Sequence, residues 1–278
     1  MPQLQYVTPA WQDAGMVDGA STQWSDRETA AAYRRFAAAY PKYRETSHDL
    51  VSRARLEDAR LVVDLCSGTG ATTDAILDVL SASGRVLAVD RSAAMQAEAR
   101  NVIHDPRVRY VVCSAEEFDR HAAEPVDAVV CNSAIWQTEM PATFAAARRA
   151  LAPGGRLVFN VGGRFVRLPP VDQPARRTPS LFDLVRQYVI LGPRPDRSPE
   201  MINQWVRDAG LVVAGSEVVA YESTVEEDRA WLSIPIIAGG FSTVPYAQWM
   251  DILEKAHQKV DKDRKSTIRW LVVTAEVR

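Results

Sequence analysis

The sequence predicts an α/β fold with a doubly wound, mainly parallel sheet. Three observations lead to this prediction. Short apolar runs alternate with helical patterns through the middle of the chain, a glycine turn follows the first run, and an acid ends the second. The first run and its turn read Leu61-Val-Val-Asp-Leu-Cys-Ser-Gly-Thr-Gly70, and the second run ends at Asp90. The 278 residues suffice for one large domain with inserts.

Each element is predicted from the spacing of its apolar residues. Five strands alternate with helices in the central part, and two further strands lie toward the C-terminus. The predicted strands cover residues 61–65, 86–90, 108–113, 126–131, 156–161, 211–221 and 268–277. The predicted helices of this part cover residues 72–82, 93–101, 143–151, 201–211 and 246–260, and a turn at residues 152–155 precedes the fifth strand.

Residues 1–60 are predicted to form an N-terminal arm followed by two cap helices. The first 24 residues show no periodicity. From Asp26 the apolar residues recur at helical spacing until Pro41 ends the helix, and a second helical stretch runs from about His48 to Asp58. The spacing of the tyrosines of this segment indicates that they pack in the core of these helices.

Residues 61–278 are predicted to form the main domain, with two long inserts at residues 162–199 and 222–267. Long inserts in a compact domain are usually functional or flexible. Both leave the sheet at or near the carboxyl ends of its strands, so we expect them to form a lid; the alternative is a dimer interface. The apolar wall of this lid is predicted to include Trp231, Pro235, Ile236, Ile237 and Phe241.

Composition excludes several classes of protein. Hydrophobic residues make up 47% and charged residues 24%, as in soluble globular proteins, and the net charge of -2 favours neither nucleic acid nor an anionic membrane as partner. No apolar run reaches membrane length, which predicts a cytoplasmic protein, either a monomer or a homodimer. Cys66, Cys113 and Cys131 lie at or just after predicted strands, which indicates buried thiols and no metal site.

The glycine turn and Asp90 together indicate a site for a nucleoside cofactor. Gly68 and Gly70 allow a tight turn and a close approach of the backbone to a ligand, and a carboxylate at the end of the second strand can accept hydrogen bonds from both ribose hydroxyls. A dinucleotide site would have a third glycine, but Ala71 follows Gly70. Asp64 would repel a pyrophosphate and suits a ligand that carries an ammonium group.

These residues resemble motif I of the class I S-adenosylmethionine-dependent methyltransferases, which typically reads Asp-x-Gly-x-Gly-x-Gly. Cys66 stands where the first glycine is usual. The resemblance is to the small-molecule branch, similar to the ubiquinone/menaquinone-type methyltransferases. It implies a Rossmann-like seven-stranded sheet with an antiparallel last strand and S-adenosyl-L-methionine as cofactor. It also implies that Asp64 lies near the methionine end and that Asp90 holds the ribose.

The resemblance implies further cofactor contacts from the cap and the strand ends. A tyrosine of the cap is expected to lie near the sulfonium, and the residues after the second, third and fourth strands to contact adenine and the methionine portion. Ser114 is alternatively the N-cap of a helix with Glu117, and Met95 is alternatively a core residue. The additional candidates are Tyr33, Tyr43, Cys66, Arg91, Met95, Ser114, Ala115, Glu116, Asn132, Ser133 and Ala134.

The segment after the fourth strand resembles motif IV of the same branch, which implies contact with the methyl acceptor. Trp136 and Gln137 are expected to face it, together with Trp231, Ile236 and Phe241 of the lid; Trp136 is alternatively an anchor of the next helix. His48 and Glu139 are the candidate general bases, although positioning alone suffices in many methyltransferases. Surface or structural roles remain open for both.

Three functional hypotheses follow. The first is methyl transfer to a small, largely apolar or aromatic metabolite, and the Ala- and Arg-rich composition suggests a bacterial source in which such enzymes often modify secondary metabolites. The second is methyl transfer to RNA or protein, which would require a basic face or a peptide groove. The third is a protein of this fold that binds S-adenosylmethionine without transferring its methyl group. The atom that accepts the methyl group, oxygen, nitrogen or carbon, stays open.

Overall fold

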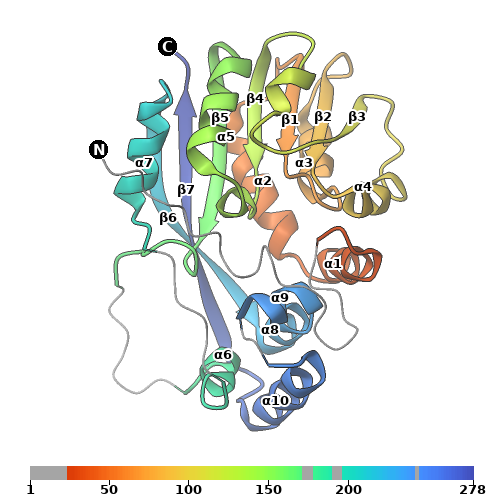
Figure 1. Cartoon of the computed structure of the whole chain (residues 1–278), viewed down its shortest axis with the longest axis vertical. Coiled ribbons are helices and arrows are strands. Elements are labelled where there is room, and N and C mark those ends of the chain that lie inside the picture. The colour runs from red at the N-terminus through yellow and green to blue at the C-terminus, as the bar shows by residue number, and fades with distance from the viewer. Residues whose placement is uncertain (1–23, 171–177, 190–195, 242–243) are drawn as a thin grey trace.

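The computed structural model describes residues 24–170, 178–189, 196–241 and 244–278. These residues form a seven-stranded sheet with helices on both faces (Figure 1). The strand order is β3-β2-β1-β4-β5-β7-β6, and β7 is antiparallel to both of its neighbours while β1 to β5 are parallel. The predicted seven-stranded α/β fold with an antiparallel last strand is confirmed.

The strands have bounds close to those predicted. They are β1 Leu61–Leu65, β2 Arg85–Asp90, β3 Val108–Val112, β4 Val126–Cys131, β5 Leu151–Gly162, β6 Val212–Thr224 and β7 Lys265–Glu276. The predicted turn at residues 152–155 is wrong as a separate turn, because these residues continue β5. Gly154, at φ 77°, donates its backbone N–H to Val277 there, and the pairing of β4 with β5 shifts register beside it.

Helices cover both faces of the sheet and its carboxyl edge. They are α1 Arg27–Ala39, α2 Lys42–Ala54, α3 Ala71–Val79, α4 Ala93–Arg100, α5 Met140–Ala150, α6 Leu181–Val185, α7 Pro199–Asp208, α8 Val225–Leu232, α9 Pro235–Phe241 and α10 Tyr246–Lys259, with short 3-10 turns η1 Phe118–His121 and η2 Ile135–Gln137. The prediction that the second cap helix begins at His48 is wrong. Pro41 ends α1 but also begins α2, because proline is tolerated at a helix start.

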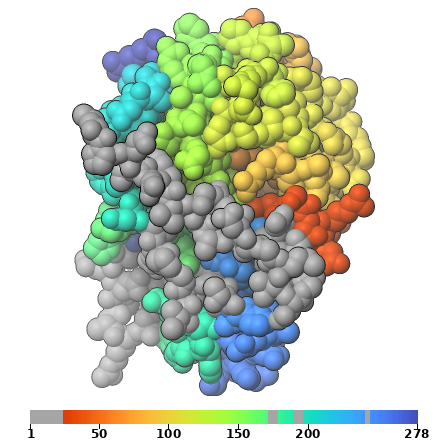
Figure 2. All heavy atoms as spheres, viewed as in Figure 1, coloured from red at the N-terminus to blue at the C-terminus, as the bar shows by residue number. Residues whose placement is uncertain are grey.

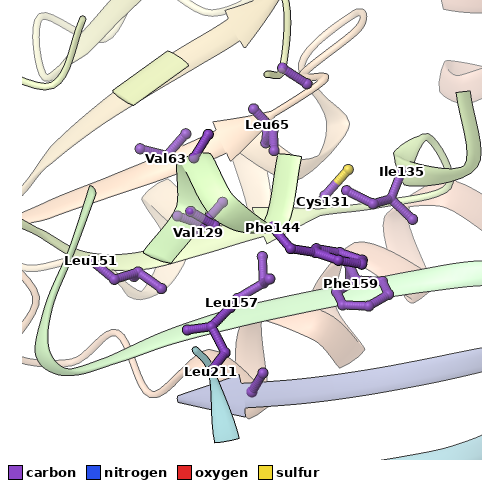
Figure 3. Close-up of a cluster of buried hydrophobic side chains, with 14 of the residues drawn as sticks. Val63, Leu65, Val129, Cys131, Ile135, Phe144, Leu151, Leu157, Phe159 and Leu211 are labelled. Carbon is purple, nitrogen blue, oxygen red and sulfur yellow. The ribbon is translucent and has the colours of Figure 1, made fainter. Parts of the chain in front are cut away.

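Alternate residues of the strands fill two hydrophobic cores, one on each face of the sheet. On one face Val63, Val129, Leu157 and Phe144 pack with neighbours from α5 and α7 (Figure 3). On the other face a second cluster joins the strands to α1, α2 and α3, with Leu50 and Ile76 among its buried members. The central strands are buried on both sides, as parallel sheets require.

The two inserts form one separate lobe beyond the carboxyl ends of the parallel strands. Helix α6 comes from the first insert, and α8, α9 and α10 come from the second (Figure 1). Their apolar side chains form a third cluster, in which Leu181 and Val185 pack with Trp249 and Leu253. Figure 2 shows this lobe below the sheet domain. The lid-wall candidates Pro235, Ile236 and Ile237 lie in α9, and Ile236 is buried.

None of the described helices is long and apolar enough to cross a membrane. The predicted N-terminal arm, residues 1–24, lies almost entirely outside the described residues.

Candidate active site

The loop between β1 and α3 presents open backbone at the carboxyl end of the sheet. Cys66, Gly68 and Gly70 all have positive φ, at 58°, 52° and 93°. The two glycines serve different purposes. A Cβ on Gly70 would lie 2.6 Å from the Cδ1 atom of Ile103, so this glycine permits packing of the loop on the protein. A Cβ on Gly68 would meet only the Cys66 carbonyl oxygen, at 4.0 Å, so this glycine faces open space that a ligand can occupy.

Asp90 lies at the end of β2, and its carboxylate is tied to the glycine loop. One oxygen accepts from the Gly68 backbone N–H at 2.8 Å, and the other accepts from the Ser92 backbone N–H at 2.7 Å. Each oxygen keeps a lone pair for a further donor. Burial raises the pKa of Asp90, while the two backbone donors oppose that rise. This position and capacity fit a pair of ribose hydroxyls, and the assignment of Asp90 to the ribose stays a prediction.

Asp64 is almost completely buried at the base of the same loop. Its Oδ2 accepts from the Thr73 hydroxyl at 2.5 Å, whereas its Oδ1 has no hydrogen-bond partner among the described residues. Burial raises the pKa of Asp64 to about 7. A buried carboxylate with a free oxygen is stabilised by a cation, so the site suits a positively charged ligand.

The cap tyrosines lie over this edge. The Tyr33 and Tyr43 rings are 5.2 Å apart, and the ring of Trp24 meets Tyr33 edge-on at 5.6 Å. Burial raises the pKa of Tyr33, with smaller contributions from Tyr43 and Asp90. The structure therefore brings Tyr33 close to both Tyr43 and Asp90, and Tyr43 packs in the core of the cap.

Asn132, after β4, fastens the cap to the sheet. Its Nδ2 atom donates to the Ser47 hydroxyl at 2.9 Å and to the Thr46 hydroxyl at 3.0 Å, both on α2. Its Oδ1 accepts from Asn160 of β5 at 2.8 Å, and Asn160 in turn accepts from the Ser133 backbone N–H at 2.6 Å. This network holds Ser133 at φ 60°. The amide N–H groups of Asn132 are engaged by α2 in this arrangement, so its side chain has no free N–H for the predicted contact with a cofactor.

The loops after β3 and β4 are joined by one hydrogen bond. The Glu116 carboxylate accepts from the Glu139 backbone N–H at 2.8 Å. The predicted capping box of Ser114 is wrong, because the following turn, η1, begins only at Phe118 and has Glu117 at its N-cap position. Ser114 is half-buried and Ala115 is buried beside it. Met95 is buried in the first turn of α4, and Arg91 is exposed.

The two candidate bases are both exposed. The His48 side chain is 47% exposed and lies 4.0 Å from Asp78, near the far end of α3. Glu139 is exposed at the start of α5 and makes no side-chain capping bond there. These placements favour surface roles for both residues over a role as general base.

The acceptor candidates lie on two sides of the site. Trp136 stacks on Phe165 of the first insert, with ring centroids 3.4 Å apart, and Gln137 is half-buried beside it in η2. Trp231 of α8 donates from Nε1 to the Tyr43 hydroxyl at 3.0 Å. Ile236 is buried against the cap cluster. The side chain of Phe241 lies outside the described residues.

The structure also reveals residues that the sequence analysis missed. Lys42 precedes Tyr43 and is only 2% exposed, which no periodicity predicts for a lysine. Its Nζ lies 4.5 Å from the centroid of the Trp231 ring, and burial lowers its pKa to about 8. Glu227 is equally buried on α8, and its carboxylate accepts from the Tyr221 hydroxyl at 3.1 Å. The one available signal was the position of Lys42 directly before an expected ligand-facing tyrosine.

Comparison with known proteins agrees with this geometry. Residues 62–155, which span β1 to the first part of β5, match a family described as a methyltransferase domain. Two curated proteins are similar to the chain, both named trans-aconitate 2-methyltransferase. The protein from Azoarcus sp. (strain BH72) is 30% identical over 155 residues, which are 55% of this chain and 54% of that protein. The protein from Paracidovorax citrulli is 32% identical over 136 residues, which are 47% and 48% of the two chains.

Three solved structures share the fold at less than 25% identity. A Haloferax volcanii protein assigned as a methyltransferase, in complex with the activator Trm112, has a TM-score of 0.58 at 18% identity, covering 92% of this chain and 97% of that one. The phosphoethanolamine N-methyltransferase 2 of Haemonchus contortus, bound to S-adenosylhomocysteine, has 0.53 at 19%, covering 92% and 60%. The [4+2]-cyclase SpnF has 0.52 at 17%, covering 83% and 80%.

The glycine loop and Asp90 lie within the segment that matches the methyltransferase domain, and the strand order is similar to that of the class I S-adenosylmethionine-dependent methyltransferases. The chain spans about half the length of the curated relatives it matches. S-adenosylmethionine is the cofactor of this class, and the site fits it. The backbone is open at Gly68, and the Asp64 Oδ1 atom and the Ser67 hydroxyl are buried without partners among the described residues. The Asp64 carboxylate suits the cationic methionine end, and the Asp90 carboxylate suits the ribose hydroxyls.

Proposed function

We propose that this protein transfers the methyl group of S-adenosylmethionine to a small-molecule acceptor. The observation that carries this proposal is the lid. Trp231 of the second insert contacts the Tyr43 hydroxyl of the cap, so cap and insert meet over the carboxyl end of the sheet. A covered site of this kind favours a small acceptor over a protein or RNA surface.

In this proposal the bound cofactor supplies an electrophilic methyl group on its sulfonium, and the protein supplies alignment. Asp90 would hold the ribose, Asp64 would lie nearest the cationic methionine end, and the tyrosines of the cap would exclude water. No step is assigned to His48 or Glu139, because both are exposed. An acceptor that arrives with a lone pair, such as a carboxylate or a neutral amine, would need no base.

The names of the curated relatives suggest one acceptor class, because trans-aconitate is a small carboxylic acid. The sequence itself suggested a largely apolar or aromatic metabolite and a role in bacterial secondary metabolism. The aromatic side chains Trp136, Phe165 and Trp231 support an unsaturated or aromatic portion of the acceptor. Methyl transfer to RNA or protein is the second candidate function, because one protein of this fold is found in complex with an activator protein.

The test is the release of S-adenosylhomocysteine by purified protein. The protein and S-adenosylmethionine are incubated with the small-molecule pool of an extract, and separately with its protein and RNA pools. We expect release with the small-molecule pool alone. Release only with the protein or RNA pool would support the second candidate, and cofactor binding without release from any pool would support a non-methylating role, which the fold of SpnF also accommodates.

A further inference from the structure

We propose that Lys42 binds an anionic group of the methyl acceptor, so that the substrate class is a small metabolite bearing a carboxylate or a phosphate. This inference rests on the proposed function, because it concerns the acceptor side of the same site. It assigns a specificity-determining role to a residue of the cap.

Lys42 is held by aromatic rings. Its Nζ lies 4.5 Å from the centroid of Trp231 and 5.8 Å from those of Phe36 and Tyr43. The side chain is 2% exposed. A desolvated ammonium is stabilised by such rings, but they do not neutralise its charge.

No salt bridge joins Lys42 to an acid within the described ranges of the chain. The nearest carboxylates are those of Glu227 and Asp228 on α8, which attract it from a distance. Their oxygens instead accept hydrogen bonds from Tyr221 and Ser223 of β6, at 3.1 Å and 2.6 Å. Burial therefore outweighs this attraction and lowers the pKa of Lys42 to about 8. A buried lysine without a paired acid lowers the stability of the fold, and an anionic ligand would supply the missing partner.

The position of Lys42 connects it with the acceptor. The next residue, Tyr43, accepts from Trp231 of the lid, and its hydroxyl lies beside Ser133 at the end of β4. Tyr43 also packs on Tyr33, whose neighbour on the cofactor side is Asp90. Lys42 thus lies where cap and lid meet, on the lid side of the tyrosines rather than on the Asp90 side.

The experiment measures binding to the protein saturated with S-adenosylhomocysteine, by calorimetry. One panel holds small carboxylic acids, including trans-aconitate and citrate, and a second holds phosphate monoesters; each acid is paired with its neutral ester or alcohol. The variant is Lys42→Met. The matched control is Lys259→Met, because Lys259 also lies over a tyrosine ring, that of Tyr188, but on the exposed surface of α10.

We expect at least one acid to bind at least tenfold more tightly than its neutral partner. Lys42→Met should abolish this preference, whereas Lys259→Met should keep it. In the wild type the preference should fall as the pH rises through about 8, since Lys42 then loses its charge. The titratable groups that act on Lys42 are Tyr43, Glu227 and Asp228, and Tyr221 and Glu45 in turn act on Glu227. Which panel contains the tightest ligand distinguishes carboxylate from phosphate.

Three outcomes would overturn the inference. They are equal binding of acids and their neutral partners, absence of binding by every acid, and an unchanged preference for acids in Lys42→Met. Cofactor binding by Lys42→Met and its circular dichroism spectrum show that the variant is folded. The two proposals fail separately. Methyl transfer to the small-molecule pool that is unaffected by Lys42→Met removes the role of Lys42 alone, whereas anion binding without any methyl transfer removes the proposed function.

Discussion

The assignment of Asp90 to the cofactor ribose can be tested by replacing it with alanine. In the protein, the Asp90 carboxylate accepts from the backbone N–H groups of Gly68 and Ser92, at 2.8 Å and 2.7 Å, and its remaining lone pairs are available to two ribose hydroxyls. A hydrogen bond to a charged group contributes about 1.5–3 kcal/mol. Two such bonds correspond to a loss of about a hundredfold or more in affinity, since ~1.4 kcal/mol is tenfold.

The assay is calorimetric titration with S-adenosylhomocysteine at about pH 8, an alkaline pH chosen because burial raises the pKa of the Asp90 carboxyl. Asp90→Ala also leaves two backbone donors without a partner, so a control must separate local binding from general damage. Asp127→Ala provides it. The Asp127 carboxylate likewise accepts from two backbone N–H groups, those of Arg60 and Leu61, at 2.7 Å and 3.0 Å, but at the amino end of β1.

We expect Asp90→Ala to lose cofactor affinity and Asp127→Ala to lose only thermal stability. An affinity of Asp90→Ala within about twofold of the wild type would refute the assignment. So would equal losses of affinity in the two variants, because the effect would then arise from the fold rather than from the ribose contact.

Three further predictions concern the glycine loop and the two buried titratable groups. Gly68→Ala should weaken cofactor binding with a modest loss of melting temperature. Gly70→Ala should chiefly destabilise the fold, by roughly 2 kcal/mol or more, because alanine is strained at φ 93° and its methyl group would also displace the Ile103 side chain. The reverse ranking in calorimetry and thermal melts would contradict the loop geometry. Cofactor binding should release a proton near pH 6.5 but not near pH 8.5, because a cation lowers the pKa of Asp64 from about 7; binding heats that do not depend on the buffer at the lower pH would count against this. Lys42→Met should stabilise the fold at pH 7 by about 1–3 kcal/mol. This figure is the free energy that corresponds to the fall of the Lys42 pKa from 10.5 to about 8, reduced by the loss of the contacts with aromatic rings. Between those two pKa values the unfolded wild-type chain binds more protons than the folded one, so the stability of the wild type rises with pH there. The gain in stability of Lys42→Met over the wild type is therefore full below pH 8 and should vanish in denaturant titrations as the pH approaches 10.5. A gain that grows with pH would contradict this.

The sheet and its cofactor edge were predictable because local rules determine them. Buried strands have continuous apolar runs, and the runs ending at Leu65 and Cys131 have the predicted bounds. The glycine loop and Asp90 lie within 30 residues of each other, so their spacing in sequence carries the information. The start of α2 was predicted wrongly because proline can either end one helix or begin the next, and Pro41 does both.

The acceptor side was not predictable in the same way, because it depends on contacts between distant segments. Tyr43 and Trp231 are 188 positions apart, and their hydrogen bond joins the cap to the second insert. Lys42 is buried where Trp231 of α8 packs over the cap, and a sequence pattern gives no sign of that. His48, one position after the buried Ser47, faces outward for an equally simple reason, since neighbouring helix residues point in different directions.

The two inserts illustrate the same limit. They lie between β5 and α7 and between β6 and β7. Their helices pack on one another through Leu181 and Trp249, which come from different inserts. This mutual packing supports a lid that acts as one body, whereas the sequence allowed a dimer interface from the same apolar residues.

The most direct measurement for the whole account follows the methyl group itself. The purified protein is incubated with methyl-labelled S-adenosylmethionine and an unfractionated extract, and the label is then traced to small molecules, protein or RNA. The account predicts label in the small-molecule fraction with wild-type protein and none with Asp90→Ala at limiting cofactor. Label confined to protein or RNA would contradict it.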